Sequence, residues 1–153
     1  MPPATGLSTS GLTPRSERLE RVIALGTGAG LLTLLVVASW LAPSPAGSGT
    51  HTQLGLPRCG WVAAFNRPCP TCGMTTAFAH AAHGHAGASF VAQPMGAVLA
   101  VLSAAGFWAS LHVVLTGSRV GSLCGSLLRP RVLWVVLGAG AAAWAYKFLT
   151  WPV

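Results

Sequence analysis

The sequence predicts an all-α integral membrane protein with three transmembrane helices and a short amphipathic or re-entrant helix after a CPTCG motif. Of the 153 residues, 52% are hydrophobic and only 7% are charged, whereas soluble domains have ~25% charged residues. The hydrophobic residues form long runs, each close to the ~20 residues that cross ~30 Å of hydrocarbon. These observations exclude a soluble globular enzyme, and the high hydrophobicity excludes disorder over most of the chain.

The N-terminal part of the chain combines a polar arm with the first apolar run. Residues 1–14 are rich in Pro, Ser, Thr and Gly, so we expect a disordered arm, followed by a single membrane domain over residues 15–153. Residues 22–41 carry no charge and are predicted to form the first span, in which Gly26 and Gly30 have the GxxxG spacing of close helix contacts. Because this run exceeds the ~7–15 apolar residues of a signal peptide, we expect an anchor that is not cleaved.

The rest of the membrane domain is predicted to consist of a polar loop and two further spans. Residues 43–93, the cysteine loop, are rich in Pro, Gly and Ser and are expected to lie outside the hydrocarbon. Within them the spacing predicts a short helix over residues 73–83 that ends near Gly84. The apolar face of that helix is predicted to carry Met74, Phe78 and Ala81. The second and third spans are expected at residues 96–115 and 132–149.

The distribution of basic residues predicts the orientation. Six of the nine Lys and Arg residues either precede the first span or lie between the second and third spans, and the positive-inside rule places such regions in the cytoplasm. The N-terminus is then cytoplasmic and the cysteine loop faces outside. The net charge of +7 is scattered rather than clustered, so we expect no nucleic-acid partner. The expected partners are the lipid bilayer and a membrane protein or a second copy of the chain.

Three of the four cysteines, Cys59, Cys69 and Cys72, lie in the outer loop and are candidates for a disulfide or a redox pair. Thiols tend to pair in an oxidising compartment, but three cysteines allow three single pairings, which the sequence leaves open. Cys124 falls on the predicted cytoplasmic side and is expected to be inert. In the redox interpretation, Cys69 or Cys72 lies at a helix start, where the dipole lowers a thiol pKa. No thioredoxin-like βαβ pattern surrounds the pair.

The CPTCG motif also has the form of a metal-binding knuckle, which makes zinc the cofactor that the sequence suggests. A closed zinc site needs four ligands, of which the three loop cysteines could supply three. The fourth would be one of the nearby histidines: His51, His80, His83 or His85. Since His80 lies ~12 Å along a continuous helix from Cys72, a single site needs a break in that helix or His51 from the loop. Otherwise His80 and His83 form a separate weak chelate or are polar residues on a wet helix face.

No catalytic constellation is visible in the sequence. The only acidic residues, Glu17 and Glu20, lie on the predicted cytoplasmic flank, so paired carboxylates or a carboxylate-oriented triad cannot form near the cysteines. The sequence therefore favours a non-enzymatic membrane component over an enzyme.

A pattern of motif residues runs from the first cysteine of the loop into the second span. In chain order these are Cys59, Cys69, Pro70, Cys72, Gly73, Thr75, Gly84, Gln93 and Pro94. With this pattern, residues 59–102 resemble a bacterial membrane family catalogued as domain-of-unknown-function family 2752. Thr76 and Gln93 depart from it, because the family more often has Arg and Asn there. The resemblance implies a small multi-pass protein of the bacterial inner membrane and brings no established activity.

Overall fold

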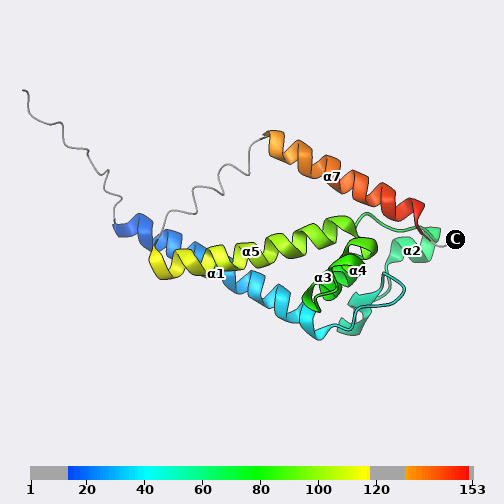
Figure 1. Ribbon diagram of the computed structural model, residues 1–153, viewed down its shortest axis with the longest axis horizontal. Helices are drawn as coiled ribbons and strands as arrows, with labels where there is room; N and C mark the ends of the chain where they lie inside the picture. Colours follow the sequence, from blue (N-terminus) through cyan, green and yellow to red (C-terminus); the bar gives the residue numbers. More distant parts are fainter. Residues whose placement is uncertain (1–13, 118–129, 152–153) are drawn as a thin grey trace, which may run out of the picture.

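Three long helices run through the molecule, and each is long and apolar enough to cross a membrane (Figure 1). They are α1 (Pro14–Trp40), α5 (Pro94–Thr116) and α7 (Pro130–Leu149). The computed structural model describes residues 14–117 and 130–151, and this part of the chain contains helices and no strand. The predicted all-α fold with three transmembrane helices is therefore confirmed. Residues 1–13 of the predicted arm, and Cys124, lie outside the described residues.

Proline marks the start of each long helix. Its missing N–H costs nothing in the first turn, and its fixed φ suits a helix. The predicted spans at residues 96 and 132 therefore begin two residues late, because Pro94 and Pro130 are already helical. α5 ends at Thr116 and is capped by Gly117, which has a φ of 68° and donates its N–H to the carbonyl of Val113.

α1 and α5 pack along each other through small residues. A Cβ added to Gly28 of α1 would lie 3.2 Å from the Ser110 Cβ, and one added to Gly106 of α5 would lie 3.0 Å from the Leu31 Cδ1. The predicted contact residues Gly26 and Gly30 have no atom within 4 Å of a built Cβ. The glycine of α1 that lies close to α5 is therefore Gly28, midway between the two predicted positions.

The segment between α1 and α5, residues 41–93, gathers at one end of the long helices and is called the cap here (Figure 1). Its elements are η1 (Thr50–Leu54), α2 (Gly60–Phe65), α3 (Met74–Ala82) and α4 (Ala86–Ala92). α3 is the short helix predicted from the sequence. α2 and α4 were not predicted, because helices of six or seven residues carry too little hydrophobic periodicity to be recognised.

α3 joins the cap to the long helices. Phe78 packs with Ala38 of α1 and Ala100 of α5, and Met74 and Ala81 lie against this cluster, so the predicted apolar face is confirmed. The opposite side of α3 is not wet along its whole length. Thr76 is fully buried, and its hydroxyl is hydrogen-bonded to that of Thr50 at 2.8 Å.

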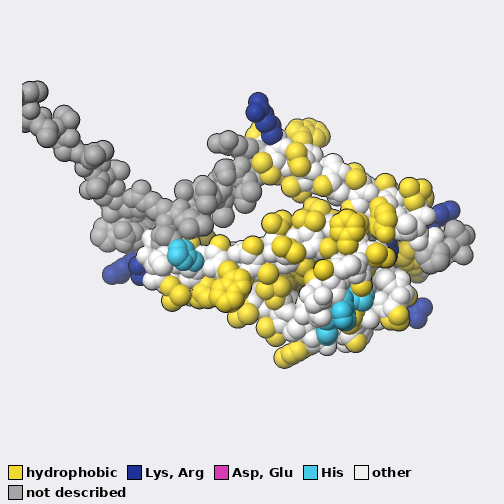
Figure 2. Space-filling view, in the orientation of Figure 1, with side chains coloured by type: hydrophobic (Ala, Val, Ile, Leu, Met, Phe, Trp, Pro, Cys, Tyr) yellow, Lys and Arg dark blue, Asp and Glu magenta, His cyan; other side chains and the backbone are white. Residues whose placement is uncertain are grey.

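α7 reaches the cap through its last two turns. The Trp144 indole donates a hydrogen bond to the Pro68 carbonyl (3.2 Å), and the Lys147 ammonium donates one to the Gly47 carbonyl (3.1 Å). The guanidinium of Arg67 lies 5.0 Å from the centre of the Phe148 ring. On the face seen in Figure 2, hydrophobic side chains cover the length of the helices and basic ones lie near their ends.

Candidate functional site

The CPTCG motif forms a tight turn that leads into α3. The Cys72 N–H donates to the Cys69 carbonyl (2.9 Å), and the Met74 N–H donates to the Thr71 carbonyl (3.1 Å). Gly73 follows with a φ of 87°, in the left-handed region that favours glycine. A Cβ there would lie 2.8 Å from the carbonyl oxygens of both Ala92 and Gly47. Backbone conformation and space therefore both require glycine at this position.

Of the other motif residues, Gln93 contacts the turn, and Thr75, Gly84 and Pro94 lie at helix ends. The carbonyl of Pro70 accepts a hydrogen bond from the buried Gln93 side chain at 3.2 Å. Thr75 lies in the first turn of α3, Gly84 has a φ of 77° just after its end, and Pro94 is the first residue of α5. The motif residues thus lie where α3 begins, where it ends and where α5 begins.

The structure brings the three loop cysteines into one region. Cys59 precedes α2 as its N-cap residue, and its thiol interacts with the thiol of Cys69. Both residues are partly exposed, whereas Cys72 is buried. The thiol of Cys69 also lies 3.4 Å from the Thr71 hydroxyl.

The thiols of Cys59 and Cys72 differ in acidity. The backbone N–H of Val62, near the start of α2, lowers the pKa of Cys59 against a smaller opposing effect of burial, and Cys69 lowers it further. Burial raises the pKa of Cys72 to about 11, and the neighbouring Cys69 and Cys59 add to that rise. Because the thiolate is the nucleophile, we expect Cys59 to be the more reactive thiol and Cys72 the less reactive one.

In the reduced protein we expect iodoacetamide to alkylate Cys59 much faster than Cys72. With a pKa of about 11, Cys72 has on the order of 100-fold less thiolate at neutral pH than an ordinary thiol. Mass spectrometry of quenched time points measures both rates on the same molecules. The Cys72 rate should rise with pH up to about 11, and equal rates at neutral pH would contradict its burial.

The predicted metal ligands divide into two groups. His51, Cys59, Cys69 and Cys72 line one cavity of about 440 Å³. His80 lies instead in the last turn of α3, and His83 directly follows that helix. Within residues 14–117 and 130–151, no three His, Cys, Asp or Glu side chains form a group that could hold a metal ion.

Three histidine rings lie close together where α3 ends, with those of His83 and His85 stacked and that of His80 tilted against His85. The His85 ring centre lies 6.0 Å from that of His80 and 6.4 Å from that of His83. The Nδ1 of His80 is buried without a hydrogen-bond partner among the described residues. Burial lowers the pKa of His80, and His85 and His83 lower it further. Its imidazole is therefore neutral over a wider pH range than an ordinary histidine.

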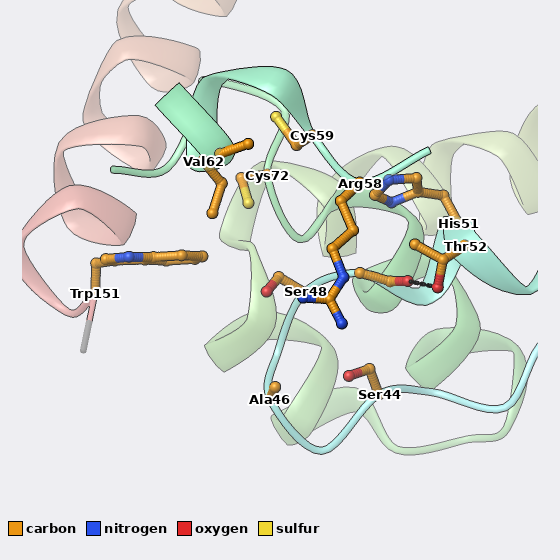
Figure 3. A pocket seen from close by; sticks show the side chains of 12 residues that line it. Ser44, Ala46, Ser48, His51, Thr52, Arg58, Cys59, Val62, Cys72 and Trp151 are labelled. Carbon is orange, nitrogen blue, oxygen red and sulfur yellow. Dashed lines mark hydrogen bonds between the residues drawn. The ribbon is translucent and has the colours of Figure 1, made fainter. Parts of the chain in front are cut away.

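A second, larger cavity adjoins the cysteines and was not predicted. It measures about 580 Å³, and in Figure 3 its walls come from the loop after α1, from η1, from the start of α2 and from the end of the chain. Its lining residues include Ser44, Ser48, Arg58 and Trp151. Cys59 and Cys72 also line it, but no motif in the sequence points to the other walls, because they come from segments that only the fold brings together.

The fold and the cysteine region define a small helical membrane protein with three candidate spans and a cysteine-bearing cap. The family described as "Protein of unknown function (DUF2752)" matches residues 59–108, about a third of the chain. This match runs from the first cap cysteine into α5 and confirms the family resemblance expected from the motif. Searches of curated proteins and of solved structures give no match.

Proposed function

We propose that this protein is a non-enzymatic component of a bacterial inner membrane whose outer cap is closed by a structural disulfide between Cys59 and Cys69. The observation that carries the proposal is that Cys59 and Cys69 line the same cavity, with Cys69 near enough to lower the pKa of the Cys59 thiol. The basic residues in the first turns of α1 (Arg15, Arg18 and Arg21) and around the start of α7 (Arg119, Arg129 and Arg131) favour a cytoplasmic location for those ends. The cap then faces an oxidising compartment, where such a disulfide persists.

Burial distinguishes this pair from the other two pairings. Cys72 is buried and has a raised pKa, so it is a poor attacking thiol. Cys59 attacks one sulfur of an oxidising protein disulfide and releases the other sulfur as a thiolate. Cys69 then attacks Cys59 in the mixed disulfide and releases the second acceptor thiolate. Two electrons pass to the acceptor, which leaves as a dithiol, and the cap thiols lose two protons.

The disulfide would hold α2 against the CPTCG turn. Closing a loop of this short length stabilises a fold by about 2–3 kcal/mol in the chain-entropy description. α2 also presents two exposed aromatic residues, Trp61 and Phe65, with ring centres 5.6 Å apart. Such side chains favour the membrane–water interface, so the lipid bilayer is the partner that this part of the cap suits.

A second candidate function is thiol–disulfide exchange by the same pair. The partial exposure and lowered pKa of Cys59 favour it, because a reactive exchange thiol needs both access and thiolate character. A reduction potential separates the two functions. A structural disulfide has a potential below about −300 mV, and an exchanging one lies above that value.

Mass mapping of cysteine linkages in native membranes, after blocking free thiols, tests the disulfide. We expect a peptide pair joined through Cys59 and Cys69, with Cys72 recovered as a blocked thiol. Cys72→Ser is the matched control, because it should leave that linkage intact. A linkage through Cys72, or three free thiols, would contradict the proposal. Stoichiometric zinc on three reduced cysteines would instead support a metal site with His51.

A further inference from the structure

We propose that the 580 Å³ cavity of the cap binds the phosphate of a phospholipid headgroup, with Arg58 as the principal ligand. Cys59 and Cys72 lie in its wall, but phosphate binding forms no bond to either sulfur, so the proposal does not rest on the disulfide. The cavity size lies within the ~300–1,000 Å³ typical of small-molecule sites.

Charge is the first argument for an anion. Arg58 lines the cavity and has no ion-pair or hydrogen-bond partner within residues 14–117 and 130–151. The two acidic residues of the chain, Glu17 and Glu20, fall at the start of α1, at the other end of that helix from the cap. An arginine without a carboxylate nearby offers its planar fork of N–H donors to an external anion, and that fork matches phosphate geometry.

The other walls supply what a phosphate ester needs. In Figure 3 the hydroxyl-bearing side chains of Ser44 and Ser48 border the same cavity as the Arg58 guanidinium. Those hydroxyls can donate to phosphate oxygens that the guanidinium does not reach. The Trp151 ring closes another side of the cavity and offers an apolar surface to the glycerol part of a lipid.

The position of the cavity favours a phospholipid headgroup over free phosphate as the ligand. Two walls of the cavity follow directly on spanning helices: Ser44 lies four residues after the end of α1, and Trp151 lies two residues after the end of α7. The cavity is therefore at the membrane–water interface, whichever side the cap faces. The phosphates of phospholipid headgroups lie at the same level.

The test uses the full-length protein in a neutral detergent, titrated with dihexanoyl-phosphatidylglycerol and, separately, with inorganic phosphate. Broadening of the phosphorus NMR signal measures binding. We expect saturable binding of the short-chain lipid, weakened roughly tenfold or more by Arg58→Gln, because hydrogen bonds to charged groups are the strong ones. Arg67→Gln is the matched control. It removes the same charge from the cap but lies outside this cavity, so its affinity should stay within about twofold of the unmodified protein.

The outcomes separate the sources and the alternatives. Tighter binding of the lipid than of inorganic phosphate supports a headgroup site, and equal binding assigns the site to free phosphate. Absence of saturable binding for both probes overturns the proposal, as does equal weakening by Arg58→Gln and Arg67→Gln. If Arg58→Gln does not fold, Arg58→Lys replaces it. That variant keeps the charge, loses the fork and should still bind several-fold more weakly.

Discussion

Gly73→Ala is expected to lower the stability of the protein by about 2–5 kcal/mol, a large part of the ~5–15 kcal/mol of a typical domain. A left-handed backbone costs a non-glycine residue ~1–2 kcal/mol. The new methyl group would also lie 2.8 Å from two backbone carbonyl oxygens, on Ala92 and Gly47, and such overpacking costs ~1–3 kcal/mol. Neither carbonyl is the end of a flexible side chain, so the cap itself must shift.

Thermal unfolding of Gly73→Ala in detergent measures this loss, with an expected fall of roughly 5–15 °C in the midpoint. Gly84→Ala is the matched control. It has a similar φ of 77° but no atom within 4 Å of a built Cβ, so it retains only the backbone cost. Equal midpoints for the two variants would show that the close carbonyl contacts are unimportant.

Gly96→Ala is expected to separate α3 from α5 and to destabilise the protein by about 1–3 kcal/mol. The added Cβ would lie 2.8 Å from the Ala77 Cβ and 3.1 Å from the Met74 sulfur. Met74 can rotate away, but Ala77 is fully buried and is fixed to its helix. The normal gain of ~0.5–1 kcal/mol from replacing a helical glycine is therefore outweighed.

Two measurements on Gly96→Ala separate displacement of the cap from a general loss of stability. The first is the unfolding midpoint, and the second is the alkylation rate of Cys72, which should rise if α3 moves. Gly138→Ala in α7 is the control, because nothing lies within 4 Å of its built Cβ. A Gly96→Ala variant as stable as that control, with Cys72 still protected, would refute the close packing of α3 on α5.

The sequence predicted the long helices and α3 well because their signals are local. Twenty apolar residues are a sufficient signal for a span, and the spacing of Met74, Phe78 and Ala81 is visible without knowledge of the neighbours. Gly28 was missed as the contact residue between α1 and α5 because GxxxG spacing does not say which face meets the partner helix. The face of α1 that meets α5 depends on the position of Ser110, which is more than eighty residues away from Gly28 in the chain.

The candidate site was only partly predictable for the same physical reason. The CPTCG motif identified Cys69 and Cys72, and the structure adds that Cys72 is buried whereas Cys59 is partly exposed and has a lowered pKa. Burial is a property of the packed cap and has no signature in the spacing of cysteines. Nothing in the sequence singled out Arg58, because its place in a cavity depends on the distant Trp151.

The attachment of α7 has a mechanical consequence. Trp144, Lys147 and Phe148 hold its last turns to the cap, whereas its packing on α5 is slight compared with that of α1. Helices adapt to a thinner or thicker bilayer by tilting. A change in bilayer thickness should therefore alter the tilt of α7 about its attachment to the cap. The angle between α1 and α5 should stay the same, because these two helices pack along each other.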